Sequence, residues 1–432
     1  MSLTKTVGFV AVTTLAIGGA AFGAEQNNDA LAQIAELKAQ IAELKGAQGS
    51  QWLTEQRAAE IRGIVTDVLA DSETRSSLQG ASGSGYNGGF FLSSSDGNFS
   101  MKINVLEQIR WTFNNQEVLV DEKDPRTEQV SGFENKRTRL TFGGNMVDSS
   151  WSYRLQYYMG YSNSNEPGVG EGELGDAMVS KDFGNGFSVT VGQFRLPFSA
   201  EYAIDTGMLQ FNDYSVANTV FNAGYGQGLM IGYSADAFRF GLAYVNELAD
   251  ANQAWGSVPS NDWAFSGRGE FKFSGDWAQF NDAQSWKGEG MGAKVGIGYA
   301  AEQDNATGAN PYSFTVDGTV DFGGANIAAA YYSADDDAGT DGTGFTVAGG
   351  VFVTDDFEAV VRYENIEDAF ATELNTLVLG GNWYLAKNTA KLGLEFGYSF
   401  DAIPAGAEFA GWVDSGGDDG EWLLQAQLSF NF

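Results

Sequence analysis

The sequence has no cysteine and no histidine among its 432 residues. Without cysteine there are no disulfides, thiolate metal sites or cysteine nucleophiles. Without histidine a Ser-His-Asp triad and a histidine-bound zinc site are excluded, and with them most hydrolase mechanisms. No other pairing of a nucleophile with a base is evident. We therefore predict that the protein is not an enzyme, has no cofactor and holds no metal.

Basic residues are also scarce. There are 24 Lys and Arg against 56 Asp and Glu, a formal charge of -32. Such a charge excludes nucleic acid as a partner, because nucleic-acid binding needs a basic surface. The shortage is uneven, since residues 100–200 hold 10 basic and 13 acidic residues, whereas residues 201–432 hold 8 and 33.

Long apolar runs are missing after the first two dozen residues. Residues 1–24 have a basic start at Lys5, an apolar stretch and small residues before cleavage after Gly23 or Ala24, as in a secretory signal peptide. No later apolar run reaches the ~18 residues that a membrane-spanning helix needs. We therefore expect an exported protein that can enter a membrane only as a closed barrel.

Residues 25–80 have helical periodicity. Within residues 25–47 the repeated heptad IAELKAQ-IAELKGA predicts a coiled coil with apolar a and d positions. Its predicted core is Ile34, Leu37, Ile41 and Leu44. A single amphipathic helix packed on its own barrel is the alternative, and Ile at a with Leu at d would by itself favour a dimer. Residues 48–80 predict a second helix, and residues 81–99 a flexible linker rich in glycine.

From residue 100 onward the periodicity changes to two. In the first such segment Ile103, Val105 and Ile109 alternate with Lys102, Asn104 and Gln108. We predict an all-β transmembrane barrel of about 16 antiparallel strands over residues 100–432, with an N-terminal α-helical coiled-coil extension. The expected strands are 100–113, 135–147, 150–161, 174–183, 186–194, 226–235, 236–246, 262–275, 290–302, 311–322, 324–334, 343–353, 356–366, 373–386, 389–401 and 421–432.

Strand length and turn pattern favour this barrel over a soluble β-sandwich. Sandwich strands are usually ~5–6 residues, whereas these segments are long enough to cross a bilayer with tilt. Short turns alternate with long loops, as expected of periplasmic turns and outer loops. The turn 276–289 is too long for this pattern and suggests a miscounted strand. The last strand ends in the aromatic Phe432, which resembles the signal read by the outer-membrane assembly machinery.

Two segments resemble porins of the phosphate-selective O and P type. They are residues 89–99, GFFLSSSDGNF, and residues 191–199, VGQFRLPFS. The resemblance implies a sixteen-stranded homotrimer in outer-membrane lipid, with its third outer loop, here residues 195–225, folded into the pore. It also implies that the N-terminal helices lie in the periplasm. The chain lacks the ladder of Arg and Lys found in phosphate-selective members, which argues against phosphate selectivity.

A porin needs a water-filled lumen and charges at its narrowest point. Strand parity places four arginines on inward faces, and the third loop adds three acids. The predicted constriction is Arg110, Arg137, Arg139, Arg154, Glu201, Asp205 and Asp213. A basic wall facing an acidic loop would orient dipolar solutes; pairing of these groups for barrel stability is the alternative. Arg195 has the wrong parity for the lumen unless the chain bends near Pro197.

The predicted function is passive diffusion of ions and small hydrophilic solutes, with mild cation preference from the acidic outer loops. The alternative is a structural anchor that tethers the envelope by binding the cell wall through its periplasmic helices. The acidic clusters, such as residues 335–337, match no complete calcium loop and are interpreted as solvated loops.

Overall fold

The computed structural model describes residues 35–40, 42–43, 63–64, 83–115, 129–159, 172–249, 251–254, 263–303, 308–337, 341–367, 373–403, 410–413 and 419–432. The chain divides into two units, residues 1–81 and 82–432. None of the described helices is long and apolar enough to cross a membrane.

The described residues of the first unit are all helical and exposed. Of the predicted coiled-coil core only Leu37 is among them, and 56% of its surface is exposed. Ile34, Ile41, Leu44 and the predicted signal peptide lie outside the described residues. The coiled coil therefore stays a prediction.

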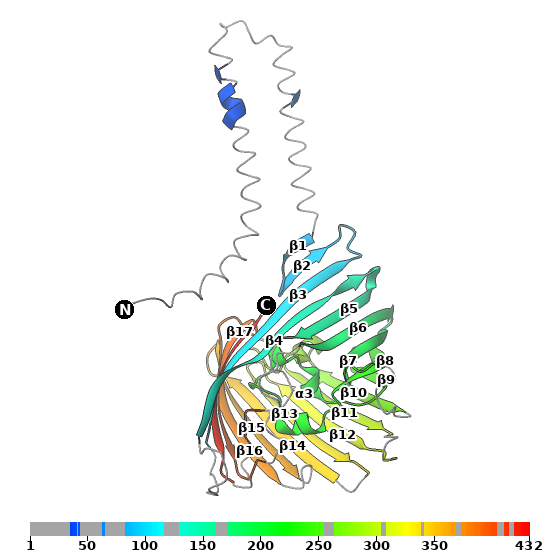
Figure 1. The fold of residues 1–432 in the computed structure, drawn as a ribbon, viewed down its shortest axis with the longest axis vertical. Helices are drawn as coiled ribbons and strands as arrows, with labels where there is room; N and C mark the ends of the chain where they lie inside the picture. The colour runs from blue at the N-terminus through cyan, green and yellow to red at the C-terminus, as the bar shows by residue number, and fades with distance from the viewer. Residues whose placement is uncertain are drawn as a thin grey trace, which may run out of the picture. The chain divides into compact units, whose positions relative to one another are not determined.

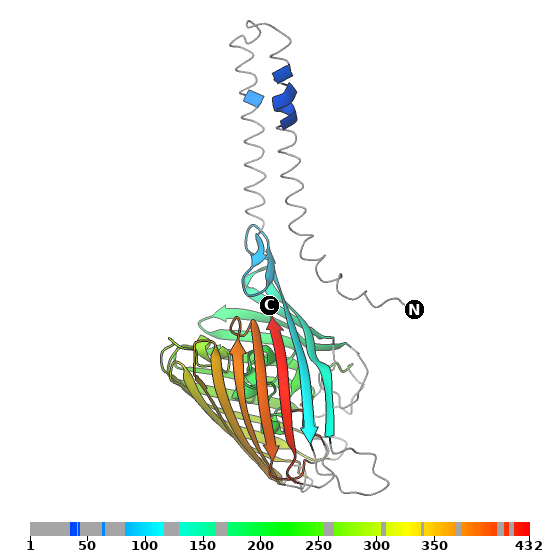
Figure 2. The same ribbon diagram turned by 90° about the vertical axis from the view of Figure 1, so that its left-hand side faces the viewer.

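The second unit is a closed antiparallel barrel. Its strands β3 to β18, sixteen in number, pair in chain order, and β18 pairs with β3 to close the sheet (Figures 1 and 2). The strands are β3 Ser100–Asn115, β4 Gln129–Met146, β5 Asp148–Tyr158, β6 Glu173–Gly184, β7 Phe187–Arg195, β8 Tyr225–Ser234, β9 Phe238–Val245, β10 Ala264–Ser274, β11 Gly292–Glu302, β12 Tyr312–Asp321, β13 Ala325–Asp335, β14 Asp341–Phe352, β15 Phe357–Glu367, β16 Leu374–Tyr384, β17 Ala390–Ser399 and β18 Trp422–Asn431. The predicted sixteen-stranded antiparallel barrel is confirmed.

Alternation of side chains makes the outer face apolar and the lumen polar. In β3, Gln108 and Arg110 are 1% and 0% exposed, whereas Ile109 between them is 40% exposed. The register of β3 against β4 shifts after Gln108: Gln108 lies opposite Arg137 and Ile109 opposite Asn135, so Lys136 is the inserted residue of β4. This β-bulge turns both Lys136 and Arg137 to the buried inner side.

The predicted linker contains two further strands. Strands β1 (Gly83–Tyr86) and β2 (Phe90–Ser93) form a hairpin, and β2 pairs with Ser100–Ile103 of β3. Just beyond this segment, Phe432 exchanges two backbone hydrogen bonds with Val105, of 2.6 and 3.0 Å. Residues 81–99 are thus not wholly a flexible linker. The start of β3 extends past the end of β18, and β2 pairs with this part of β3.

The long turn between β10 and β11 hides no strand. Residues 275–291 contain the 3-10 helix η2 (Trp277–Asn281) and irregular chain that carries the buried side chains of Phe280, Gln284 and Trp286. The suspicion of a miscounted strand was wrong. The segment is long because it packs other residues instead of making a tight turn.

Candidate functional site

The third outer loop, residues 196–224, lies inside the barrel (Figure 1). It has three short helices, α3 (Ala200–Ala203), η1 (Thr206–Met208) and α4 (Val216–Phe221). Each helix begins after a residue whose side chain accepts a backbone N–H bond, respectively Ser199, Asp205 and Ser215. These caps satisfy backbone donors that would otherwise be buried without partners, so the loop can leave the wall and cross the lumen.

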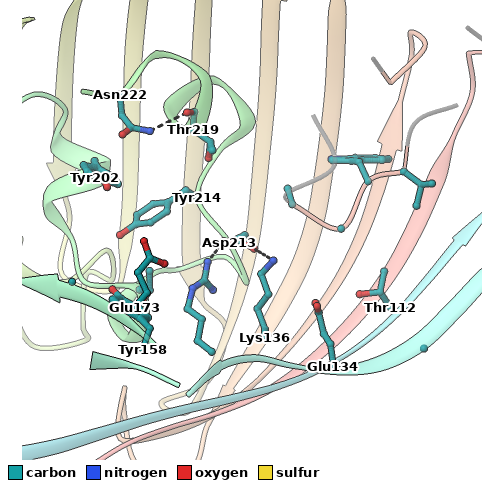
Figure 3. A pocket seen from close by; sticks show the side chains of 18 of the residues that line it. Thr112, Glu134, Lys136, Tyr158, Glu173, Tyr202, Asp213, Tyr214, Thr219 and Asn222 are labelled. Carbon is teal, nitrogen blue, oxygen red and sulfur yellow. Dashed lines mark hydrogen bonds and ion pairs between the residues drawn. The ribbon is translucent and has the colours of Figure 1, made fainter. Parts of the chain in front are cut away.

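Asp213 of this loop joins three cations of the barrel wall. Its carboxylate lies 3.0 Å from Arg110 Nη1 of β3, 2.5 Å from Arg137 Nη2 and 3.7 Å from Lys136 Nζ of β4. All four residues are buried. Figure 3 shows Lys136 and Asp213 pointing toward one another. The ion pairs fix the middle of the loop against β3 and β4.

A second cluster forms around Asp205, eight residues earlier in the loop. Its carboxylate lies 2.7 Å from Arg139 Nη2 and 3.5 Å from Arg154 Nη2. Arg154 also pairs with Asp176 of β6 at 3.0 Å, and 40% of its side chain remains exposed. Arg154 is therefore the most accessible of the four predicted arginines.

Glu201 lies apart from these two clusters. It accepts hydrogen bonds from the backbone N–H of Ser215, at 2.7 Å, and from its hydroxyl, at 2.5 Å. Burial raises its pKa. Glu201 thus braces α3 against α4 within the loop. Of the seven predicted constriction residues, the structure brings six into two ion clusters on one wall, with the arginines in contact with the acids.

Arg195 does reach the lumen. Its Nη1 donates to the carbonyl oxygens of Tyr202 and Ile204 and to the hydroxyl of Tyr214, at 3.0, 3.1 and 2.8 Å. The bend is at Gly192, where φ is 120°, three residues before Arg195. Parity counted from the earlier part of β7 therefore fails beyond Gly192, and Arg195 stabilises the base of the loop.

Other loop contacts had no clear signal in the sequence. On the opposite wall, Gln210 Nε2 donates to Asn326 and Glu358, at 2.9 and 2.6 Å. Arg268 donates to the carbonyl oxygen of Phe198 at 2.7 Å, and Arg362 to that of Asp213 at 3.0 Å. The loop is thus held from both sides of the barrel.

Two cavities lie on either side of the loop. One, of about 630 Å³, is lined by Glu134, Glu173 and Tyr158 of the wall and by Tyr202 and Tyr214 of the loop (Figure 3). The other, of about 1020 Å³, is lined by residues of the strand ends near short turns, including Lys102, Arg154 and Lys387, and by Asp205. The first cavity is lined by Tyr202 and Thr206 and the second by Ala203 and Asp205, so both cavities adjoin this stretch of the loop.

We expect the third loop to stay attached to the barrel wall at acidic pH. Burial opposes ionisation of Asp213, but the charges of Arg137, Arg110 and Lys136 outweigh it and hold its pKa below the usual range. The pKa of Asp205 is lowered in the same way by Arg139 and Arg195. A lowered carboxyl pKa gives stability that is present above the unfolded value of ~3.9 and is lost only as pH falls through the folded value.

We therefore expect the open-channel conductance of purified protein in a planar bilayer not to rise between pH 7 and pH 4. Variants that lack Asp213 serve as the comparison, because they have already lost the anchor at both pH values. A wild-type conductance that rises between pH 7 and pH 4 would show that protonation releases the loop near the ordinary carboxyl pKa.

In the part of the chain that the structure describes, no group of three or more acidic residues is arranged to hold a metal ion. The polar groups of the site bind one another and line the cavities of about 630 and 1020 Å³. Such an arrangement can sort solutes by size and charge.

Comparison with known proteins agrees with this geometry. Residues 103–336 match the family model "Phosphate-selective porin O and P". Two solved structures have the same fold. The anion-selective porin from Comamonas acidovorans has a TM-score of 0.52 and 15% sequence identity, and the match covers 77% of this chain and 99% of that one. OmpF of Salmonella typhi in complex with daunomycin has a TM-score of 0.53 and 11% sequence identity, and the match covers 78% of this chain and 98% of that one. Among curated protein sequences none matches.

Proposed function

The chain belongs to the family of phosphate-selective porins O and P, an outer-membrane β-barrel channel family, and from this premise we propose that it is a passive diffusion channel. Ions and small hydrophilic solutes cross a water-filled lumen that the third loop narrows. The loop held inside the closed barrel, between cavities of about 630 and 1020 Å³, is the observation that carries this proposal.

We infer that the narrowest part is the stretch from Tyr202 to Thr206, because this stretch lines both cavities. Arg139 and Arg154 face Asp205 there in ion pairs, which reduces the field across the passage compared with separated charges. The partly exposed Arg154 is then the residue that most directly meets passing ions. The constriction thus combines both earlier alternatives, because pairing of the buried arginines stabilises the loop and the accessible arginine sets the local charge.

Net preference for cations is expected to be mild. In the lining of the cavity of about 630 Å³ the charges balance, with Lys136, Arg137 and Arg195 against Glu134, Glu173 and Asp213. Selectivity then comes from the acidic excess of the whole chain, 56 acidic against 24 basic residues, which enriches cations near the mouth. Phosphate selectivity is not part of the proposal, because no basic ladder continues through residues 201–432.

The channel is proposed to assemble as a homotrimer, with residues 25–80 in the periplasm after removal of a signal peptide. The heptads of residues 25–47 support self-association. The resemblance of the barrel to porins supports three copies rather than two.

Single-channel recording in a planar bilayer tests the function. We expect stepwise conductance in groups of three, and a reversal potential in a salt gradient that corresponds to weak cation preference. Insertion without conductance would refute the channel and favour the structural anchor. Strong anion selectivity would leave the channel intact but refute the charge argument.

A further inference from the structure

The periplasmic-side turn formed by residues 275–291 folds inward under the third loop. The backbone N–H of Ala283 donates to the carbonyl oxygen of Met208 at 3.1 Å. The Gln284 side chain donates to the carbonyl oxygen of Leu209 at 2.9 Å and is 1% exposed. These two bonds connect the turn directly to the third loop.

The barrel wall holds the turn in this position. Asn326 of β13 donates to the carbonyl oxygen of Ala283 at 2.7 Å, and Asn388 donates to Gln284 at 2.8 Å. The Trp286 ring, 7% exposed, packs against Phe352 and Tyr384 with centroids 5.1 and 4.8 Å apart. Bonds and packing from several strands make this a fixed element.

The turn adds acidic groups to the cavity of about 1020 Å³. Its Asp282 and Glu289 are two of the three carboxylates that line it, the third being Asp205. Whereas Asp205 is paired with arginines, Asp282 accepts from Trp286 Nε1 at 2.9 Å and Glu289 from the Trp286 backbone N–H at 3.0 Å. These donors are neutral, and Lys387 of the same cavity is the basic residue whose charge acts on Asp282. The basic lining comes from Lys102, Arg139, Arg154 and Lys387.

We propose that residues 275–291 are a second selectivity element of the channel, which supports the third loop and places Asp282 and Glu289 on the path of permeating cations. This inference rests on the proposed channel function. It divides the selective part of the pore into two levels, an ion-paired one at the loop and one below it, where Asp282 and Glu289 share the cavity with Lys102 and Lys387. The positively charged end of a solute is favoured next to these two carboxylates.

Cysteine substitution tests the element sharply because the chain has no cysteine of its own. Glu289→Cys should lower the cation-to-anion permeability ratio about twofold in a salt gradient. Reaction with a sulfonatoethyl thiosulfonate reagent should restore the ratio and reduce conductance, and a trimethylammonium reagent should lower the ratio further. Asp236→Cys, at an exposed position in the turn between β8 and β9, is the matched control. Reaction of this cysteine with either reagent should change neither the permeability ratio nor the conductance.

If mass spectrometry shows complete reaction at position 289 while permeability and conductance equal those of the control, the inference is overturned. A silent wild-type protein would instead overturn the channel function itself. Support of the third loop is tested separately by Gln284→Ala, which should at least double the open-channel current noise. Gln279→Ala, which removes an amide from the same turn, should leave the noise unchanged, and equal noise in both variants would refute the support.

Discussion

Replacing Asp213 with asparagine should raise single-channel conductance severalfold and lower the thermal stability of the barrel. Asp213 is the shared partner of Arg110, Arg137 and Lys136, all of them buried. Removing one partner of a buried ion pair typically costs about 3–5 kcal/mol, because the remaining charge is left uncompensated. The three cations repel one another once the carboxylate is gone. The third loop should therefore leave the wall and widen the passage between the two cavities.

The measurements are conductance in a planar bilayer and thermal unfolding followed by circular dichroism. Asp341→Asn is the control, because it removes the same charge at an exposed position at the start of β14. Adding Arg137→Gln to the Asp213→Asn variant should recover part of the lost stability, because the double variant no longer has an Arg137 charge without its anion. A variant with wild-type conductance and stability would show that these ion pairs do not hold the loop.

The barrel was largely predictable because its physical cause is local. A strand between lipid and water must alternate, and this alternation can be counted along the chain. Strands β7, β13 and β15, for example, agree with their predicted spans to within one residue at each end. The short turns were predictable for the same local reason, since a connection of a few residues between two strands leaves little room for any other structure.

Lys136 shows what such counting misses. Parity from Arg137 and Arg139 points Lys136 outward, but the bulge turns it inward. A signal was present, since the apolar outward positions change from odd at Phe133 to even at Leu140 and Phe142. A change of apolar parity within one strand indicates an inserted residue, and it could have located the third cation around Asp213.

The interior could not be predicted to the same depth. Which acid of the third loop meets which arginine depends on the path of the loop through the lumen, and side-chain spacing does not encode that path. Glu201 bonds within the loop, and Gln284 reaches the loop from a turn some 75 residues later. Such contacts join segments far apart in the sequence, so composition showed only that charged groups were available.

Replacing Gly192 with alanine should prevent or severely weaken assembly of the folded barrel. Gly192 has φ of 120°, a conformation that residues with a side chain rarely adopt and that costs of order 1–3 kcal/mol when forced. An added Cβ would also lie 2.2 Å from the carbonyl oxygen of Ala177 on the paired strand β6, and neither backbone can move without breaking the ladder. Arg195 lies just beyond this bend, so any barrel that does form should have a misplaced loop base.

Heat-dependent mobility of the folded protein in detergent gels measures the expected loss, and bilayer conductance reports on any remaining channels. Gly269→Ala in β10 is the matched control, because an added Cβ there meets no atom within 4 Å. We expect Gly269→Ala to fold and conduct like the wild type, because its methyl group enters open space. If Gly192→Ala did the same, the bend would not depend on glycine, and another cause would be needed for the inward direction of Arg195.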